Sequence, residues 1–411
     1  MKMRMKVCFE TFGCRLNRAE ALDQEAQYIA DGWEATESHE AANLIIVRGC
    51  SVTQRAQRDS ERLVAHIRKK YPFKKVIVTG CIPEAKNKGV GTSVAGFETW
   101  GGAGVAKSST IDSASGTQAP KPIPTRTARA YLKIQDGCAG QCTFCIVPKF
   151  RGSSVSVDFD AVTDRAKRFI DAGYHEIVVT GCNLSLYASQ GKRLPELLAA
   201  LSELSPDCRI RLGSLEPSNV AHDVVDVVAA RGNVCRFLHI PIQSGSNRIL
   251  VAMKRPYFVR DVNALLKAAK TKLPNVALGC DLMTGFPGEV ENDLIATKLL
   301  LESNPFSRVH VFSYSERPGT RAEKFPGSVD PMLRKERAKQ LSDIGKAKRA
   351  SYARRFLGRT VEIIVEDEKK CAGWTSEYLW CMCPHAKGEK KSPRKVRVIS
   401  VERDVLIGTP A

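Results

Sequence analysis

Three cysteines crowd into the segment DGCAGQCTFC, with the spacing C-x3-C-x2-C: Cys138, Cys142 and Cys145. Thiolates are soft ligands that select iron–sulfur clusters or zinc. Three thiolates suit a [4Fe–4S] cluster in which one iron stays open to chelate a substrate or cofactor. Zinc is the alternative, but structural zinc sites use four ligands, and the sequence places no fourth ligand nearby. The triplet therefore favours an open iron–sulfur cluster.

Three more cysteines each follow a glycine at the end of an expected strand: Cys14, Cys50 and Cys81. The expected strands are residues 6–13, 43–50 and 74–81, and helical patterns at 17–31 and 52–70 separate them. A β-α-β-α-β order predicts a parallel sheet covered by helices, and ligands bind at the carboxyl ends of such strands. We therefore expect the three thiols to converge on one metal cluster, although a lone cysteine is more often a small buried side chain.

A longer alternation follows and must position the C-x3-C-x2-C loop. Its expected strands are 131–135, 175–181, 209–214, 237–242, 277–285 and 308–314. Its expected helices are 159–172, 194–204, 218–231, 246–270 and 289–303. Six β/α units predict a partial parallel barrel, two units short of eight, with catalytic loops at the strand carboxyl ends.

The pattern divides the chain into four parts. We expect an α/β domain at 1–88, a Gly-, Ser- and Pro-rich linker or mobile loop at 89–127, a barrel core with a basic helix at 128–356, and a small all-β module at 357–411. The module can be a barrel or a sandwich. Its cysteines at 371, 381 and 383, with His385, invite a zinc hypothesis, but a C-x-C pair on a strand is poor geometry for a tetrahedral ion.

Composition points to a cytoplasmic protein with a polyanionic partner. The 411 residues carry a net charge of +19, which favours nucleic acid as a partner. No apolar run approaches about 18 residues, so we expect no membrane span, and the N-terminus lacks the features of a secretory signal. In a reducing compartment, clustered cysteines are metal ligands or catalysts more often than disulfides.

The cysteine triplet, the aromatic Phe144 before its last cysteine and the partial barrel resemble the radical S-adenosylmethionine (SAM) superfamily. The segments TFGCRLNRAE, VRGCSVTQRAQRDS and VTGCIPE resemble the domain that precedes the radical core in methylthiotransferases. The segments GRTVEIIVED and GWTSEYLW resemble the small RNA-binding β-barrel of these enzymes, the TRAM domain. The chain is therefore identified as a member of the radical SAM methylthiotransferase family. Two departures are Arg48-Gly49-Cys50, where the family usually has Asn-Thr-Cys, and Cys182, where an apolar residue is commoner.

The resemblance implies two [4Fe–4S] clusters and two roles for S-adenosylmethionine. One cluster, on the C-x3-C-x2-C cysteines, binds S-adenosylmethionine and cleaves it to a 5′-deoxyadenosyl radical. The second, on the N-terminal cysteines, delivers sulfur that another S-adenosylmethionine methylates. Residues expected to contact the cofactor are Phe144, Arg151, Thr180, Gly181, Glu216 and Gln243. Strand-end capping is the plainer role for most of them, and a surface salt bridge is the plainer role for Arg151.

The resemblance also implies a tRNA substrate, recognised at its anticodon loop, and an electron-donor protein such as a flavodoxin or ferredoxin. We expect a monomer. The branch most resembled is the MtaB type, which acts on N6-threonylcarbamoyladenosine at position 37. Isopentenyladenosine in tRNA and an aspartate of a ribosomal protein are the alternative targets. Different classes are a non-catalytic iron–sulfur RNA-binding sensor and a zinc-dependent RNA-binding protein. Tyr378, Trp380 and the basic helix at 331–356 are candidates for RNA contact, unless the helix is simply solvated.

Overall fold

The computed structural model describes residues 4–82, 98–99, 121–384 and 386–411. Most of the expected linker, and His385, lie outside this part of the chain. The described linker residues are 98–99 and 121–127, and the first two form the short strand β5 (Glu98–Thr99), which pairs in parallel with β4 (Lys75–Gly80).

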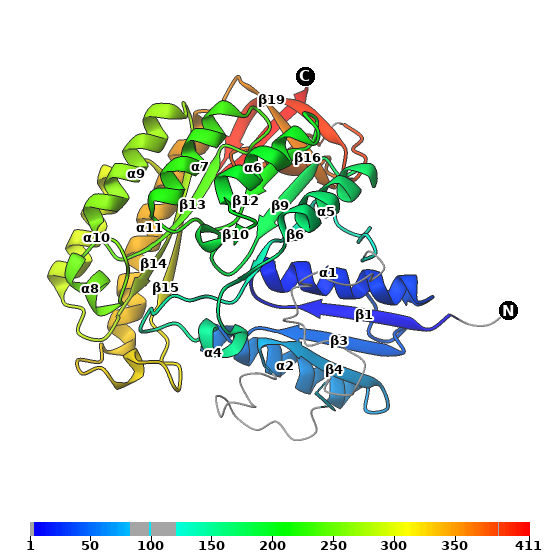
Figure 1. Ribbon diagram of the computed structural model, residues 1–411, viewed down its shortest axis with the longest axis horizontal. Helices are drawn as coiled ribbons and strands as arrows, with labels where there is room; N and C mark the ends of the chain where they lie inside the picture. Colours follow the sequence, from blue (N-terminus) through cyan, green and yellow to red (C-terminus); the bar gives the residue numbers. More distant parts are fainter. Residues whose placement is uncertain (1–3, 83–97, 100–120, 385) are drawn as a thin grey trace.

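The N-terminal sheet is parallel, as predicted, and has the strand order β2-β1-β3-β4-β5. Its other strands are β1 (Lys6–Thr11), the two-residue β2 (Glu34–Ala35) and β3 (Leu44–Gly49). Helices α1 (Arg15–Ala30) and α2 (Gln54–Lys70) lie on opposite faces of the sheet (Figure 1). Since every residue of β3 is buried between them, the domain has three layers.

The core contains the six expected parallel strands as two three-stranded sheets, β12-β9-β6 and β13-β14-β15. Isolated bridges from Ile210 to Val234 and from Ser214 to His239 join the two sheets into one partial barrel. The strands are β6 (Ala130–Lys133), β9 (Glu176–Thr180), β12 (Arg209–Leu212), β13 (Phe237–Gln243), β14 (Ala277–Thr284) and β15 (Phe306–Ser313).

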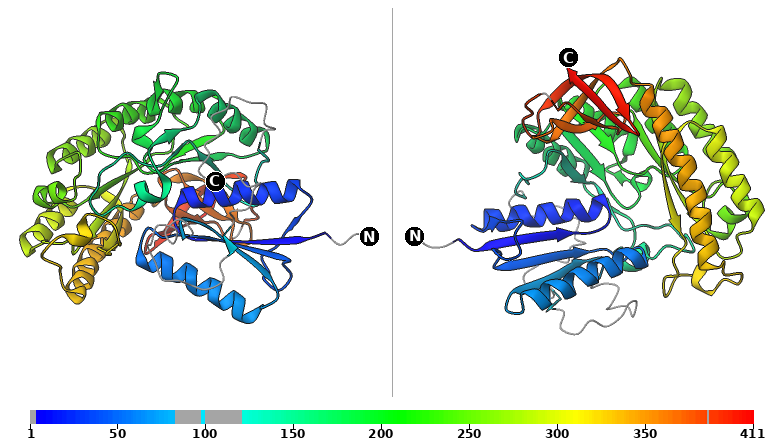
Figure 2. Two further views of the ribbon diagram at one scale, coloured as in Figure 1. Left: turned by 60° about the horizontal axis from the view of Figure 1, so that its bottom comes forward. Right: turned by 180° about the vertical axis from the view of Figure 1, so that it is seen from behind.

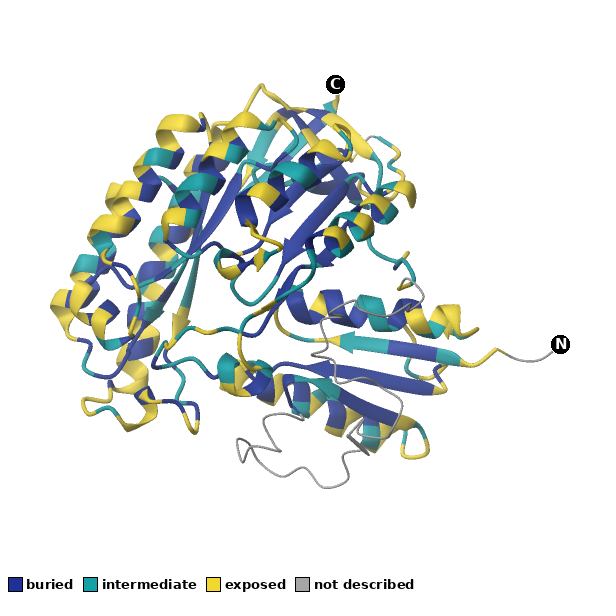
Figure 3. Ribbon diagram, in the orientation of Figure 1, coloured by how far each residue is buried: buried dark blue, intermediate teal, exposed yellow. Residues whose placement is uncertain are grey.

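Helices cover the outside of this barrel, and a single large hydrophobic cluster lies between them and the strands. Figure 3 shows the buried strands and the exposed outer faces of the helices. The helices are α5 (Phe159–Asp171), α6 (Leu194–Glu203), α7 (Asn219–Ala230), α8 (Asn247–Ala252), α9 (Val259–Lys272) and α10 (Glu291–Ser303). Short elements in the loops are α4 (Val147–Arg151), β7 (Gln135–Asp136), β8 (Val155–Ser156), β10 (Ala188–Ser189), β11 (Lys192–Arg193) and 3-10 turns at Leu184–Leu186 and Ala322–Lys324.

The prediction of one helix over 246–270 is wrong, because α8 ends at Ala252 and α9 starts at Val259. Pro256 lies in the break; it has no amide hydrogen, and it disfavours helical geometry at Arg255. Lys254 adopts a left-handed backbone with φ of 57°. The break turns Arg255 away from the helix path and toward the cysteine loop.

The C-terminal module is a closed barrel with the strand order β16-β17-β18-β20-β19. Its strands are β16 (Thr360–Asp367), β17 (Ala372–Thr375), β18 (Trp380–Met382), β19 (Pro393–Glu402) and β20 (Val405–Pro410). The long helix α11 (Pro331–Arg354) runs beside β15 and leads into this barrel (Figure 2). Cys371, Cys381 and Cys383 are buried in its hydrophobic core. No helix of the described residues has the length and apolarity that crossing a membrane requires.

Candidate active site

The ends of β1, β3 and β4 crowd together, and the glycines before the three cysteines make this possible. A Cβ atom on Gly13 would lie 2.6 Å from Cβ and 2.7 Å from Sγ of Cys50. A Cβ atom on Gly80 would lie 2.6 Å from the carbonyl oxygen of Gly49. Gly13 and Gly80 also have positive φ, at 93° and 83°, which favours glycine. The structure thus brings the loops that carry Cys14, Cys50 and Cys81 to one place.

Asn17 on α1 ties two of these strand ends together. Its Nδ2 donates to the carbonyl of Phe12 at 2.8 Å and to that of Gly49 at 3.1 Å. Its Oδ1 accepts from Nε of Arg48 at 3.2 Å. Arg48, which departs from the family pattern, is 2% exposed and forms an ion pair with Glu20. The departure therefore belongs to a buried network behind the cysteines.

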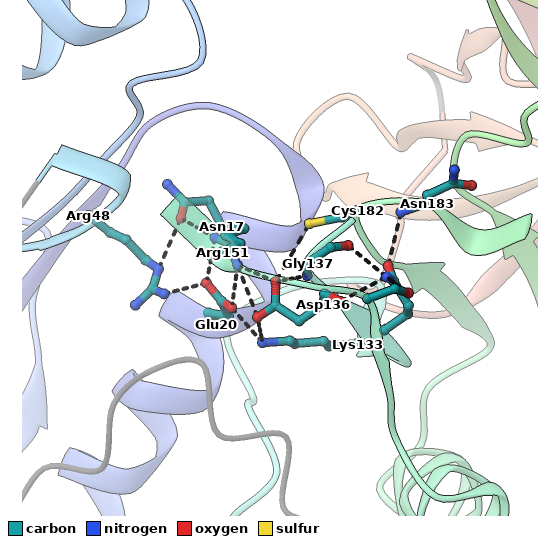
Figure 4. Close-up of polar contacts among 11 residues, drawn as sticks. Asn17, Glu20, Arg48, Lys133, Asp136, Gly137, Arg151, Cys182 and Asn183 are labelled. Atoms are coloured by element: carbon teal, nitrogen blue, oxygen red, sulfur yellow. Dashed lines mark hydrogen bonds and ion pairs between the residues drawn. The ribbon is translucent and has the colours of Figure 1, made fainter. Parts of the chain in front are cut away.

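This network joins the N-terminal domain to the barrel core (Figure 4). Arg151 at the end of α4 donates to Glu20 at 2.9 and 3.0 Å and to Asp136 at 3.0 Å. Lys133 bridges the same two carboxylates at 2.7 and 2.6 Å. Burial alone would raise the pKa of Glu20, but the charges of Arg48, Arg151 and Lys133 outweigh burial and hold this pKa well below its usual range.

Arg151 also lies within electrostatic reach of Cys81, one of the N-terminal cysteines. Burial raises the pKa of the Cys81 thiol, and the charge of Arg151 opposes that rise. The side chain is only 11% exposed and lies between two domains, so a surface salt bridge does not describe it. Its position fits a cation that offsets the negative charge of thiolate ligands.

The two cysteine trios are neighbours. Cys81 packs against Ile146 and Phe150, and Ile146 directly follows Cys145 of the core triplet. Cys182, the other departure from the family pattern, lies in the same region. Its Sγ is 3.5 Å from Oδ1 of Asp136, and it is close enough to Cys14 for their charges to interact. The loop after β6 and the three N-terminal strand ends therefore form one sulfur-rich region.

Two cysteines of the core triplet accept hydrogen bonds at their sulfurs. The amide of Gly140 donates to Cys138 at 3.3 Å, and Nη1 of Arg255 donates to Cys142 at 3.0 Å. Burial raises the pKa of the Cys145 thiol to about 12. Loading a metal centre must therefore displace protons from these thiols.

The spacing of the sulfurs fits clusters better than single zinc ions. Three sulfurs on one tetrahedral zinc, each about 2.3 Å from it, would lie about 3.8 Å apart. Among the residues that the structure describes, neither cysteine trio has all its sulfurs within 4.8 Å of one another. The groups that do are Cys8, Glu10 and His39, and His239, Asp281 and His310. Wider spacing suits a cluster whose irons each carry one thiolate.

One of the expected cofactor contacts, Glu216, belongs to a polar group beside the core triplet. Glu216 accepts from Nδ2 of Asn183 at 2.9 Å and pairs with Arg255 at 2.6 Å. Both Glu216 and Asn183 lie close enough to Cys138 to influence the pKa of its thiol. A hollow of about 370 Å³ begins at Glu216 and is also lined by Tyr257 and His222. Gln243, at the end of β13, has a φ of 73°, and such strain in a residue other than glycine clusters at functional sites.

The other expected contacts have structural partners. A Cβ atom on Gly181 would lie 2.9 Å from Oε1 of Gln135, so the close approach seen at this glycine is to Gln135. Thr180 is buried, at 3% exposure. Phe144 packs against an apolar cluster that includes Phe286 and Tyr314. For these three, strand-end packing is what the described residues display.

Sequence reasoning missed two arginines that approach the cysteines. Arg255 follows the helix break, and its contact with Cys142 depends on that break. Arg317, only 4% exposed, donates to Gln57 at 2.7 Å and lies within electrostatic reach of Cys50. Both come from barrel loops distant in sequence from the cysteines that they approach. Spacing along the chain could not have revealed them.

The comparisons with known proteins agree with this site. The chain matches the radical SAM superfamily over residues 132–301 and the uncharacterized protein family UPF0004 over residues 6–99. It is 30% identical to threonylcarbamoyladenosine tRNA methylthiotransferase MtaB of Bacillus subtilis, over 91% of this chain and 89% of that protein. It is also 30% identical to tRNA-2-methylthio-N(6)-dimethylallyladenosine synthase of Chlorobium limicola, over 89% and 88%. The chain belongs to the radical SAM methylthiotransferase family.

The fold of this methylthiotransferase is similar to that of the radical SAM methyltransferase TsrM from Kitasatospora setae. The TM-score is 0.54 at 13% sequence identity, and the match covers 78% of this chain and 77% of that one. The expected fold class is thereby confirmed: an α/β N-terminal domain, a partial β/α barrel and a small closed β-barrel. As a member of its family, the enzyme uses two [4Fe–4S] clusters and S-adenosylmethionine.

Proposed function

We propose that this enzyme converts N6-threonylcarbamoyladenosine at position 37 of tRNA to its 2-methylthio derivative. The observation that carries the proposal is the meeting of two cysteine trios at the carboxyl ends of two parallel sheets, with a buried ion network between them. A single radical SAM cluster needs only the core triplet, whereas sulfur insertion calls for a second cluster beside it. The bound clusters and S-adenosylmethionine supply the radical and the methylated sulfur.

The chain's own residues hold and orient these groups. One cluster would be held by Cys14, Cys50 and Cys81, and the other by Cys138, Cys142 and Cys145. Arg151 and Arg317 offset negative charge at the first site, and Arg255 does so at the second. In this proposal Glu216, which borders the hollow, would accept a hydrogen bond from a ribose hydroxyl of S-adenosylmethionine. Gln243, at the end of β13, would face the cofactor.

A tRNA substrate is supported by the names of the relatives and by exposed basic residues. The end of α11 and the following turn expose Arg354, Arg355 and Arg359, and β19 exposes Arg394, Lys395 and Arg397. The first group leads into the C-terminal barrel and the second lies on one of its strands. Both groups can contact phosphates. Not all of α11 is free for RNA, because Arg334 and Arg337 are buried and paired with Glu316 and Glu289.

The proposed aromatic contacts need revision in one respect. Tyr378 is stacked on Trp374 at 4.5 Å and packs against Phe237 of β13 at 4.9 Å. It therefore faces the barrel core instead of an outer RNA surface. Trp380 contacts Trp374 edge-on at 5.1 Å. We keep the C-terminal barrel as an RNA-binding module on the strength of its basic strand.

The second candidate substrate is dimethylallyladenosine, since relatives that bear this name are as similar in sequence as those named for threonylcarbamoyladenosine. Mass spectrometry of nucleosides from tRNA of cells that lack the protein separates the two. Loss of 2-methylthio-N6-threonylcarbamoyladenosine with accumulation of its precursor supports the proposal. Loss of the methylthio-dimethylallyl nucleoside instead would replace the substrate and keep the chemistry.

A further inference from the structure

The inner face of β15 presents a row of side chains to the interior of the barrel. Val309 and Val311 pack outward against the main hydrophobic cluster. Because side chains alternate along a strand, Arg308, His310 and Phe312 share the opposite, inner face. This face is open: the His310 side chain is 41% exposed and Phe312 is 43% exposed. The row lies on β15, whose carboxyl end is at the mouth of the barrel, near the cysteines.

Arg308 has no carboxylate partner among the described residues, although it is largely buried. Its guanidinium lies over the rings of Tyr378, at 4.7 Å, and Trp374, at 5.7 Å. Burial and the nearby charges of Arg349 and Arg15 lower its pKa, and they outweigh the opposing effects of Tyr378 and of Asp404, which forms its own ion pair with Arg349. A cation held in this way is costly without a counter-charge. The site therefore favours an anionic ligand.

Arg15 reaches the same place from the N-terminal domain. It directly follows Cys14, its guanidinium lies 5.1 Å from the centre of the Tyr378 ring, and its Nη1 donates to the carbonyl of Leu212 at 3.2 Å. It too forms no ion pair with any described residue. Two arginines from two domains thus flank one tyrosine inside the barrel.

The surrounding charges do not neutralise this pair. The arginines around the site number six and the carboxylates four: Arg15, Arg129, Arg209, Arg211, Arg308 and Arg349, against Glu176, Glu366, Asp281 and Asp404. Glu176 is shared by three of the arginines. The interior keeps a positive excess, which disfavours a cation at His239, Asp281 and His310 even though these groups are close enough to bind one.

These three residues instead hold Arg308 in place. Nε of Arg308 donates to Nε2 of His310 at 2.9 Å, so the His310 proton is on Nδ1. This Nδ1 donates to Oδ1 of Asp281 at 3.2 Å, and Nε2 of His239 contacts the same oxygen at 3.0 Å. The chain of hydrogen bonds fixes Nε of Arg308 and leaves both Nη groups for a ligand. His310 and Asp281 are positioning residues.

We propose that Arg308 and Arg15 bind the carboxylate of the N6-threonylcarbamoyl group and thereby select this nucleoside over dimethylallyladenosine. The inference rests on the proposed function and deepens it. A carboxylate matches the paired Nη donors of an arginine, and the exposed Phe312 offers a face on which the adenine can stack. A dimethylallyl group would leave both arginines unpaired, and sites built for polar groups reject analogues that lack them.

The test uses anaerobically reconstituted full-length enzyme and three anticodon stem-loops. Position 37 carries threonylcarbamoyladenosine, dimethylallyladenosine or plain adenosine, so all three present the same phosphates. We expect the wild type to bind the threonylcarbamoyl stem-loop at least about tenfold more tightly than the other two. In Arg308→Gln this preference disappears, and affinity for the adenosine stem-loop is unchanged. Arg260→Gln, at an 82% exposed arginine on α9, keeps the preference.

Other outcomes separate the two proposals. Equal weakening of all three stem-loops by Arg308→Gln would mean that Arg308 contacts a phosphate, and would overturn the inference. A preference that persists in Arg308→Gln would also overturn it and leave the proposed function standing. A wild type that prefers the dimethylallyl stem-loop would refute the proposed function itself. His310→Phe, which releases Arg308, should raise KM for the threonylcarbamoyl stem-loop more than it lowers kcat. Iron content and thermal unfolding of each variant exclude misfolding as the cause.

Discussion

The guanidinium of Arg151 donates two hydrogen bonds, of 2.9 and 3.0 Å, to the carboxylate of Glu20. Arg151 ends the helix that follows the core cysteine triplet, and Glu20 lies on the helix that follows Cys14. The pair therefore connects the two cysteine trios through rigid elements. Since the charge of Arg151 also acts on Cys81, one side chain links the placement of the domains to the charge at the N-terminal thiols.

Removing the charge of Glu20 should destabilise the joint between the domains. In Glu20→Gln, the charges of Arg48, Arg151 and Lys133 lose their common partner, and we expect a loss of about 3 kcal/mol or more in unfolding free energy. Urea unfolding measures it. Glu34→Gln, where the carboxylate is 54% exposed and pairs with Lys6 at 3.7 Å, is the control and should change stability by less than about 1 kcal/mol.

The same carboxylate predicts how stability depends on pH. Its pKa in the folded protein is below the unfolded value of about 4.3, so its contribution is complete above that value and is lost as the pH falls toward the folded pKa. The difference in stability between wild type and Glu20→Gln should therefore shrink between about pH 5 and pH 3. A difference that stays constant over this range would contradict the assignment.

Iron content should divide equally between the two trios. Reconstituted wild type is expected to bind about eight irons, and serine variants at Cys50 or at Cys142 are each expected to retain about four. Cys208→Ala, at a buried cysteine just before β12, is the control and should retain all of them. Loss of all iron from either single variant would show that the clusters do not assemble independently.

Arg255 should tune the cluster on the core triplet. Its Nη1 lies 3.0 Å from Sγ of Cys142, and a nearby positive charge favours the reduced, more negative cluster. Replacing Arg255 by Gln should lower the midpoint potential by about 60 mV, which corresponds to about 1.4 kcal/mol for one electron. A redox titration followed by electron paramagnetic resonance measures the shift. An unchanged potential in Arg255→Gln would mean that Glu216 alone neutralises the charge of Arg255 and that this charge does not act on the cluster.

The fold was accessible from the sequence because its elements have strong local signals. The sequence predicts the six core strands and four of the five expected core helices within a few residues, and the strands are recognisable because buried parallel strands read as apolar runs. The exceptions have physical reasons. Periodicity alone predicts one helix where Pro256 separates two. Strand β17 is only four residues long, and a Cβ atom on its glycine would lie 1.8 Å from the carbonyl oxygen of Ile364.

Only the cysteines of the site can be predicted from the sequence. Their types and spacing carry the chemistry, and each follows a recognisable strand end. The residues that surround the cysteines have neither a diagnostic spacing nor a recognisable position at a strand end. Arg255, Arg317 and Arg308 reach the site through the tertiary fold, and nothing about their neighbours in sequence distinguishes them from the other basic residues of a chain with 63 lysines and arginines.

The positive charge inside the barrel predicts an acidic tyrosine. Burial alone would raise the pKa of Tyr378, but Arg15, Arg129 and Arg308 stabilise the phenolate and lower this pKa to about 8. Burial raises the pKa of six other tyrosines, so they ionise later: Tyr28, Tyr174, Tyr187, Tyr257, Tyr314 and Tyr352. An ultraviolet titration of the metal-free protein should therefore show an early phenolate step between about pH 7 and pH 9. Tyr378→Phe should abolish that step, and Arg308→Gln should move it upward by removing one cation. A step that persists in Tyr378→Phe would assign the acidic phenol elsewhere, and a step unmoved in Arg308→Gln would place Arg308 too far from Tyr378 to act on it.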